Sequence, residues 1–226
     1  MFDNIAPAYD FMNRAMSFGL HRLWLRKALS FIRNANPAGP WLDVATGTAD
    51  VAISLGRMRP DVDITGIDLS EGMLTRGREK VKQAGLSDRV TLSKADCLRM
   101  PFADDSMGLV TVAYGVRNFQ QLGKGLAEMA RVLKPGGLLA VIELSTPTSP
   151  VIKPLYNLYA RHLIPLMGRI ASHDVRAYSY LPESIAAVPQ GSRMTALLTE
   201  AGLTNASFRT MTFGTCTLYT AFKPTN

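Results

Sequence analysis

The sequence predicts a single α/β domain built on a doubly wound, mostly parallel sheet that ends in an antiparallel hairpin. Between residues 41 and 145, apolar strand-like runs alternate with helical stretches of about ten or more residues, which is the pattern of βαβ units. Right-handed crossovers place the helices on both faces of the sheet. Near the C-terminus, two β-rich runs follow each other with only a short turn between them, so they are expected to pair as a hairpin. With 226 residues, 47% of them hydrophobic, the chain can bury one sizeable core.

The N-terminal segment, residues 1–38, is predicted to be a helical cover over the substrate and cofactor site. Apolar positions such as Leu20 and Trp24 recur at helical spacing, which indicates a helix over about residues 20–34. A shorter helix is expected before it, and the two are separated at Ser17–Gly19.

The alternating region supplies most of the sheet. Its predicted strands are residues 41–45, 62–68, 90–96, 107–115 and 138–145. Its predicted helices begin near residue 49, span residues 71–85 and span residues 122–137. The turn Lys134–Gly137 contains the Pro and Gly typical of a helix end, and a buried strand follows it at once.

The alternation breaks after the fifth strand. Residues 146–190 form a Pro-punctuated segment rich in Tyr, Leu and Ile, which we expect to be a helical lid insertion. A helix at 194–202 and strands at 206–213 and 215–222 then close the chain. All of these elements are assigned to one domain, residues 1–226.

Positive charge is concentrated in two parts of the chain. Lys and Arg number 25 against 18 Asp and Glu, a net charge of +7. Residues 11–42 contain five basic side chains and no acidic one, and residues 144–173 contain three basic side chains and no acidic one. Two basic, apolar-rich blocks suit an anionic membrane surface or a nucleic acid. Ordinary solvated helix faces explain them equally well.

The two cysteines, Cys97 and Cys216, have neither metal-ligand nor redox spacing, so we interpret both as reduced thiols of a cytoplasmic protein. The opening "MFDNIAPAYD" lacks the basic and apolar regions of a signal peptide. No apolar run approaches the roughly 18 residues that span a bilayer. We therefore expect a soluble protein whose contact with a membrane is limited to the inner surface.

The stretch "WLDVATGTADVAISL" resembles a nucleotide-binding corner in which an apolar strand turns into a helix. Gly47 is its only glycine before the helix, where a dinucleotide fingerprint would have three. The turn is nevertheless built from small residues that let a ligand approach the backbone: Ala45, Thr46, Gly47, Thr48 and Ala49. Asp68 ends the next strand, near the roughly 20-residue spacing at which a carboxylate meets ribose hydroxyls.

The charges around this turn favour a cationic ligand. Asp43 precedes the turn and Asp50 follows it, and two carboxylates repel a pyrophosphate. S-adenosylmethionine combines adenosine with a sulfonium and an ammonium group, so it fits this pattern. Asp96 ends the third strand, where its carboxylate would accept the adenine amino group, with the Cys97 amide beside it. An ordinary strand-turn-helix corner and a nicotinamide or flavin site remain the alternatives.

With these residues assembled, the chain resembles the class I S-adenosylmethionine-dependent methyltransferases, and more narrowly the ubiquinone/menaquinone biosynthesis C-methyltransferase family. The matching motifs are "MFDNIAPAYDFMNRAMSFGLHRLW", "LDVATGTAD", "GIDLSEGML", "MPFADDSMGLVTVAYGVRNF", "EMARVLKPGG", "YSYLPESI" and "TFGTCTLYTA". The resemblance implies a Rossmann-like fold. The "DVATGT" loop and the tail are most similar to the menaquinone-side members, which implies methylation of demethylmenaquinone to menaquinone.

The resemblance and the strand ends together predict the cofactor-binding residues. They are Asp43, Ala45, Thr46, Gly47, Thr48, Asp68, Leu69, Met73, Asp96, Cys97 and Ala113. Two of the family's usual residues are replaced, because Ala49 stands where members have Gly and Ala113 where they have Ser or Thr. The short helix that members carry before "MFDNIAP" is missing, which indicates a short or trimmed N-terminus.

Arg117 and Asn118, just beyond the fourth strand, are the first catalytic candidates. The Arg117 charge would stabilise a phenolate and orient a water that takes the phenol proton, or it would pair with a neighbouring acid to hold the turn. Asn118 would fix the quinol oxygen or cap the following helix. His173, as a base, and Tyr178, as a quinol contact, are further catalytic candidates. Weaker candidates for closing over the site are Tyr9, Asp10, Asp174 and Tyr180.

The expected substrate partner is a prenylated naphthoquinol, whose tail needs an apolar channel. The stretch "VIKPLYNLYARHLIPLMGRI" supplies an apolar helical array that is either plain core or a lipid passage. No metal is predicted, and no nucleic acid is expected because stacking aromatics and an RNA module are not evident. Several alternatives stay open: a benzoquinol or another small aromatic substrate, RNA methylation on the ground of the basic balance, an oxidoreductase, a cofactor-binding protein without catalysis and a homodimer.

Overall fold

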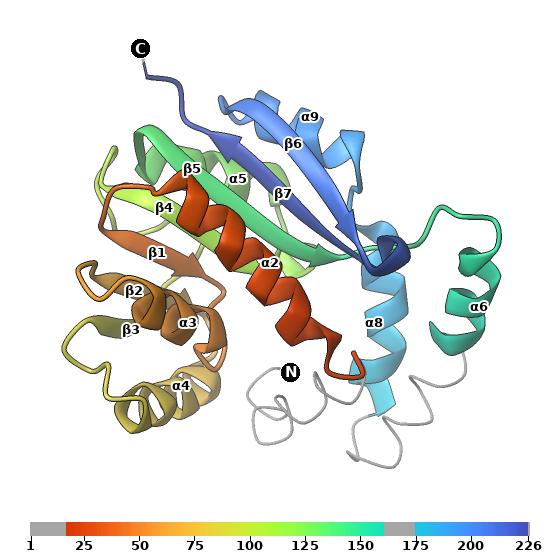
Figure 1. The fold of residues 1–226 in the computed structure, drawn as a ribbon, viewed down its shortest axis with the longest axis horizontal. Helices are drawn as coiled ribbons and strands as arrows, with labels where there is room; N and C mark the ends of the chain where they lie inside the picture. The colour runs from red at the N-terminus through yellow and green to blue at the C-terminus, as the bar shows by residue number, and fades with distance from the viewer. Residues whose placement is uncertain (1–16, 161–174, 226) are drawn as a thin grey trace.

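The computed structural model describes residues 17–160 and 175–225, and a seven-stranded sheet runs through it in the order β3-β2-β1-β4-β5-β7-β6 (Figure 1). The strands are β1 (Trp41–Val44), β2 (Ile64–Asp68), β3 (Val90–Lys94), β4 (Met107–Ala113), β5 (Leu133–Leu144), β6 (Thr204–Met211) and β7 (Cys216–Phe222). β1 to β5 are parallel, whereas β7 is antiparallel to both β5 and β6. The predicted doubly wound sheet with a C-terminal antiparallel hairpin is therefore confirmed.

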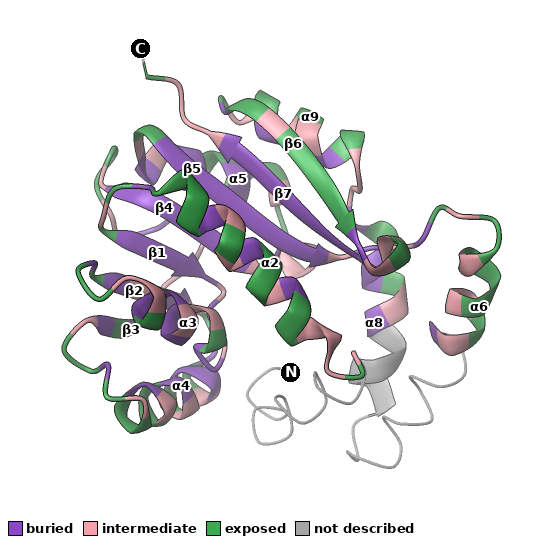
Figure 2. Cartoon of the chain, in the orientation of Figure 1, coloured by how far each residue is buried: buried purple, intermediate pink, exposed green. Residues whose placement is uncertain are grey.

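Helices cover both faces of this sheet (Figure 1). One apolar cluster contains residues of α2 (Leu20–Ala35), α3 (Asp50–Met58) and α4 (Glu71–Gln83). A second cluster, on the other face, contains residues of α5 (Leu122–Val132) and α9 (Ser192–Glu200). Consecutive residues within a strand point alternately into the two clusters, so the sheet separates two cores, and its central strands are buried along most of their length (Figure 2).

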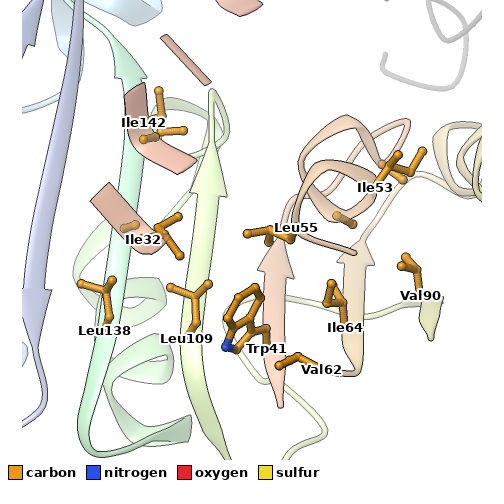
Figure 3. Packing of buried hydrophobic residues seen from close by; sticks show 14 of the residues in the cluster. Ile32, Trp41, Ile53, Leu55, Val62, Ile64, Val90, Leu109, Leu138 and Ile142 are labelled. Atoms are coloured by element: carbon orange, nitrogen blue, oxygen red, sulfur yellow. The ribbon is translucent and has the colours of Figure 1, made fainter. Parts of the chain in front are cut away.

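The packing of α2 explains why residues 20–35 form a helix on this sheet. Trp24, Ala28 and Ile32 follow each other at intervals of four, so they form one buried stripe. In Figure 3, Ile32 lies among Leu109, Leu138 and Ile142, and Trp41 of β1 lies beside Leu109 of the neighbouring β4. Burying each large apolar side chain of this kind contributes about 1.5–3 kcal/mol. The helix is thus held by its apolar stripe, and its outer face stays exposed.

The junction between α5 and β5 differs from the prediction. The helix expected to run to residue 137 ends at Val132, and β5 begins immediately at Leu133. Lys134–Gly137 is an irregularity inside the strand, because the pairing with β4 jumps from Met107↔Leu133 to Leu109↔Leu138. The helix ends because Leu133 is already extended, with φ of -66° and ψ of 138°. Gly136, with a φ of 75°, lies within the irregularity that follows.

The segment between β5 and α9 contains α6 (Ile152–Leu158) and α8 (Val175–Ala187). Short 3-10 turns, η1 (Val116–Asn118) and η3 (Thr212–Gly214), follow β4 and β6. The shorter helix expected before residue 17 lies outside the described residues. Within residues 17–160 and 175–225, no helix is long and apolar enough to cross a membrane.

Candidate functional site

A cavity of about 270 Å³ lies where the carboxyl ends of β1, β2 and β4 meet. The strand order reverses here, because β1 pairs with β2 on one side and with β4 on the other. Such a switch point is where open α/β sheets bind ligands. The cavity brings together many of the predicted residues, namely Ala45, Gly47, Asp68, Leu69, Met73, Asp96, Cys97, Ala113 and Asn118.

The turn after β1 winds through three left-handed residues. Ala45, Gly47 and Ala49 have φ values of 52°, 54° and 67°, so the backbone reverses between β1 and α3 within a few residues. An alanine in this conformation costs about 1–2 kcal/mol relative to the ordinary helical region. Ala49 is fully buried, and a methyl group built on Gly77 of α4 would come within 3.3 Å of its Cβ. Ala49 therefore accepts backbone strain while filling a contact between the turn and α4.

Asp68 is held at the mouth of the cavity by two backbone amides. Its Oδ2 accepts a 2.9 Å hydrogen bond from Gly47, and its Oδ1 accepts one of 2.9 Å from Ser70. Each carboxylate oxygen has a further lone pair, so two hydroxyl groups can still be accepted. This arrangement fits the predicted ribose contact and explains why the carboxylate has one orientation.

Asp43 and Thr46 do not line the cavity but support the turn from beneath. Asp43 is buried, and it accepts hydrogen bonds of 2.6 Å from the Thr46 hydroxyl and 2.7 Å from the Thr111 hydroxyl. Burial raises the pKa of the Asp43 carboxyl to about 6. The two hydroxyl hydrogen bonds lower this pKa, and the Asp68 charge makes a smaller contribution that raises it. The role of Asp43 seen in the structure is therefore to fix the loop.

Thr48 and Asp50 are tied to α4 instead of facing the cavity. The Lys80 ammonium donates to the Thr48 hydroxyl at 3.0 Å and to Asp50 Oδ1 at 2.5 Å. Because Lys80 balances the Asp50 charge, the expectation that Asp43 and Asp50 present two carboxylates to the ligand needs correction. The carboxylates on the cavity wall are Asp68 and Asp96, and no Lys, Arg or His is among its lining residues in the described chain. The wall still disfavours a diphosphate and suits a cation.

At the end of β3, Asp96 Oδ1 accepts a 2.8 Å hydrogen bond from the Leu98 amide, which shapes a tight turn. Cys97 follows it on the cavity wall and is half-buried. Burial, and then the Asp96 charge, raise the pKa of the Cys97 thiol to about 11. The thiol is therefore protonated at neutral pH, so Cys97 is not an activated nucleophile.

Arg117 forms a buried ion pair behind the cavity wall. Its guanidinium donates at 2.8 Å to Glu143 Oε1 and also to the Tyr114 carbonyl, and its backbone amide lies 3.3 Å from Glu143 Oε2. The side chains are only 11% and 2% exposed, respectively. The geometry matches the alternative in which Arg117 pairs with an acid to hold the turn. Its catalytic role stays a prediction. Asn118, the next residue, does line the cavity.

Two predicted catalytic residues cannot be placed. His173 lies outside the described residues. Tyr178 lies on α8, but the structure describes only the backbone at this position. The wall residues that the prediction missed include Tyr114 and Phe119, which lie before and after η1. Tyr114 could have been found from the sequence, because it follows β4 directly and so reaches the same sheet edge as Ala113.

A larger cavity of about 1070 Å³ lies between α6, α8 and the neighbouring ends of β6 and β7. Tyr156 of α6 and Ala160 just beyond it border this cavity on one side, and Phe208 borders it from β6. Tyr156 belongs to the apolar array predicted to be either plain core or a lipid passage. Its neighbours Leu155 and Leu158 are exposed instead.

Comparison with known sequences gives a consistent result. The model of the ubiE/COQ5 methyltransferase family matches residues 1–223. A demethylmenaquinone methyltransferase of Bacteroides fragilis is 47% identical over 99% of this chain and 91% of its own length. One of Porphyromonas gingivalis is 46% identical, with the same coverage. A ubiquinone/menaquinone biosynthesis C-methyltransferase of Geobacter sulfurreducens is 44% identical over 99% of this chain and 87% of its own length.

Solved structures support the fold alone. A SAM-dependent methyltransferase of Aquifex aeolicus has a TM-score of 0.64 and 21% identity over 89% of this chain and 92% of that chain. The [4+2]-cyclase SpnF has a TM-score of 0.68 and 17% identity over 89% and 81%. A cyclase on the same architecture illustrates why the fold does not decide the reaction.

Proposed function

The chain belongs to the ubiE/COQ5 methyltransferase family, and on this premise we propose that it uses S-adenosylmethionine to methylate a ring carbon of a prenylated demethylmenaquinol, forming the menaquinol. The observation that carries the substrate is the name shared by the relatives from Bacteroides fragilis and Porphyromonas gingivalis, which match nearly the whole chain. The cavity at the switch point supports the cofactor, because its wall combines small turn residues with two carboxylates.

The residues on that wall fit an adenosyl group with a cationic end. Asp68 would accept the two ribose hydroxyls, and Asp96 with the Cys97 amide would meet the adenine edge. Leu69 and Met73 supply apolar contact beside them, and Gly47 lets the backbone approach closely. When bound, S-adenosylmethionine supplies an electrophilic methyl group on a sulfonium, and the by-product is S-adenosylhomocysteine.

The remaining tasks fall to the protein. A deprotonated hydroquinone carries negative charge on the ring carbon beside its oxygen, and that carbon forms the new C–C bond while its own proton is lost to a base or to water. Holding two reactants in line can contribute about 7–11 kcal/mol. Asn118 would fix the quinol oxygen. Arg117 lies behind the wall, and its positive charge would stabilise the phenolate. The negative charge of Glu143 opposes this effect.

The polyprenyl tail requires an apolar path away from the ring. The larger cavity bordered by Tyr156 and Phe208 supports a tail site on the lid side of the sheet. A substrate of this kind resides in a membrane, so we also propose transient contact with the membrane surface. The homodimer remains a prediction that sedimentation velocity would test.

A benzoquinol of ubiquinone biosynthesis is the second candidate substrate. The relative from Geobacter sulfurreducens carries a name that includes both quinones, which favours keeping this alternative.

A single methyl-transfer assay tests both candidates. Purified protein receives labelled cofactor and either a short-chain demethylnaphthoquinol or a short-chain demethyl-benzoquinol, under reducing conditions. We expect transfer to the naphthoquinol ring carbon, with the product identified by mass spectrometry. Transfer to the benzoquinol alone would replace the proposed substrate by the alternative, and transfer to neither would reject the quinol proposal.

A further inference from the structure

The turn η3, Thr212–Gly214, is held in an unfavourable backbone conformation. Thr212, Phe213 and Gly214 have φ values of 46°, 57° and 89°, so three consecutive residues are left-handed. Only glycine adopts this region readily, and a β-branched or aromatic residue there is a genuine outlier. A sequence that keeps Thr and Phe at these positions therefore accepts strain.

Contacts from two distant segments and from the adjacent Thr215 keep the turn in this shape. The Trp24 indole donates to the Thr212 hydroxyl at 2.8 Å, from a position 188 residues earlier in the chain. Both the amide and the hydroxyl of Thr215 donate to the Thr212 carbonyl, at 3.1 and 2.9 Å. The Ser145 hydroxyl donates to the Gly214 carbonyl at 2.8 Å. Strain that persists because its surroundings impose it is typical of functional positions.

The strained turn exposes the aromatic ring of Phe213 to solvent. Phe213 is 76% exposed, so the conformation is not explained by burial of its side chain. Further exposed apolar side chains lie on the segments that meet near this turn. We call the whole set the apolar rim: Phe18, Leu23, Leu155, Leu158 and Phe213. The Trp24 contact joins α2 to η3, and the Phe18 ring lies 5.7 Å from the Tyr159 ring just beyond α6.

Positive charge predominates around the apolar rim, although Glu183 of α8 lines the larger cavity together with Lys153 and Gly214. The described segments that carry the rim, residues 17–42, 144–160 and 201–225, contain no Asp or Glu. Their exposed basic residues include Arg22, Arg26, Lys27, Arg33, Lys153 and Arg209. Among the described residues, none of these six pairs with a carboxylate. Arg22, Arg26 and Arg33 lie within about 40° of helix rotation, so they form one stripe on the outward face of α2.

Figure 2 shows this outward face of α2 exposed along its length, with η3 beside its N-terminal half. The other helical layer, α5 and α9, lies across the sheet. The apolar and basic groups thus belong to one side of the molecule.

We propose that the apolar rim and the basic stripe of α2 together dock on an anionic lipid bilayer, with Phe213 entering the interfacial region. Exposed aromatic and aliphatic side chains bordered by unpaired Arg and Lys suit such a surface. An acidic protein would satisfy the charges but would not account for a Phe held in solvent by a strained turn. This inference rests on the proposed function in one respect: docking would bring the enzyme to a quinol that resides in the membrane.

The test is co-flotation with vesicles that contain neither quinol nor cofactor. We expect binding to equal mixtures of phosphatidylglycerol and phosphatidylcholine, and much weaker binding to phosphatidylcholine alone. Arg22→Gln with Arg26→Gln should lower the partition coefficient about 25-fold, or about 5-fold per removed charge. Phe213→Asn should lower the partition coefficient roughly tenfold, because the inserted apolar ring is lost. Asn is chosen because it tolerates a left-handed backbone.

The matched control removes two charges from the opposite layer, with Lys124→Gln on α5 and Arg99→Gln in the loop whose Met100 amide donates to Glu128 of α5, both exposed positions. It should bind like the unaltered protein. Equal loss in the control and the α2 variant would overturn the surface, as would absence of binding by the unaltered protein. Phe213→Trp gives a second readout, because brominated anionic lipids should quench the new indole. Unquenched fluorescence in bound protein would exclude insertion at this turn. A failed quinol assay would leave these vesicle results unchanged.

Discussion

The Gly47 amide donates a 2.9 Å hydrogen bond to the Asp68 carboxylate, joining the turn after β1 to the end of β2. The two residues are 21 positions apart, and the parallel pairing of β1 with β2 brings their strand ends to the same sheet edge. The contact fixes both the backbone that would face a cofactor and the carboxylate that would bind its ribose.

Asp68→Ala should weaken S-adenosylmethionine binding by at least about 100-fold, because two hydrogen bonds to a charged acceptor, each worth about 1.5–3 kcal/mol, are lost. Asp68→Asn, which keeps one acceptor oxygen, should fall between this variant and the unaltered protein. Calorimetric titration measures both. Asp61→Asn serves as the control, since Asp61 is exposed and pairs with Arg59 outside the cavity. Unchanged affinity in Asp68→Ala would remove the ribose assignment.

Arg117→Ala should lower stability by about 3–5 kcal/mol, because Glu143 is left as a buried unpaired charge. Turnover should fall more than cofactor affinity. Replacing both partners, with Arg117→Met and Glu143→Leu, should recover most of the stability, as measured by urea unfolding. If Arg117 contributes its charge to the reaction, the double variant stays slow. Recovery of turnover together with stability would show that the pair only holds the turn.

Asp43 should make stability fall as pH rises from about 4 to about 6. Its folded pKa of about 6 exceeds the ordinary value of 3.8, so within this window the folded state binds more protons than the unfolded state. The corresponding change reaches at most about 3 kcal/mol. Asp43→Asn cannot titrate, so its unfolding free energy relative to the unaltered protein should rise by that amount across the window. A difference that stays constant between pH 4 and 7 would contradict the raised pKa.

Ala49→Gly should change stability by no more than about 1 kcal/mol. Relief of the left-handed alanine, about 1–2 kcal/mol, is opposed by loss of a buried methyl and by the freer unfolded chain. Gly77→Ala should cost about 1–3 kcal/mol, because the new Cβ would lie 2.7 Å from Leu92 Cδ1 and 3.3 Å from Ala49 Cβ. The double variant should be more stable than Gly77→Ala alone. Strict additivity in thermal unfolding would mean that Ala49 and Gly77 do not contact each other.

The strands and helices could be predicted because their signals are local. The stripe through Trp24 and Ile32 and the apolar runs of the strands repeat at the periods of a helix and a strand. The boundary that differs most from the prediction, at Lys134–Gly137, has a composition that is equally typical of a helix end and of an irregular strand. Which of the two occurs depends on pairing with β4, which lies elsewhere in the chain.

By itself, the sequence determined the α/β fold, the position of the site at the ends of β1, β2 and β4, and the family. Tertiary structure decided which acids face that site. Asp43 turns beneath the loop because Thr111 lies beside it, and Asp50 is neutralised by Lys80 from another helix. Helices and strands are determined largely by residues that are neighbours in sequence. The partner of a charged side chain is determined by which elements the crossovers bring together in space. The electrostatic character of the site could therefore be assigned to Asp68 and Asp96 only once the fold was known.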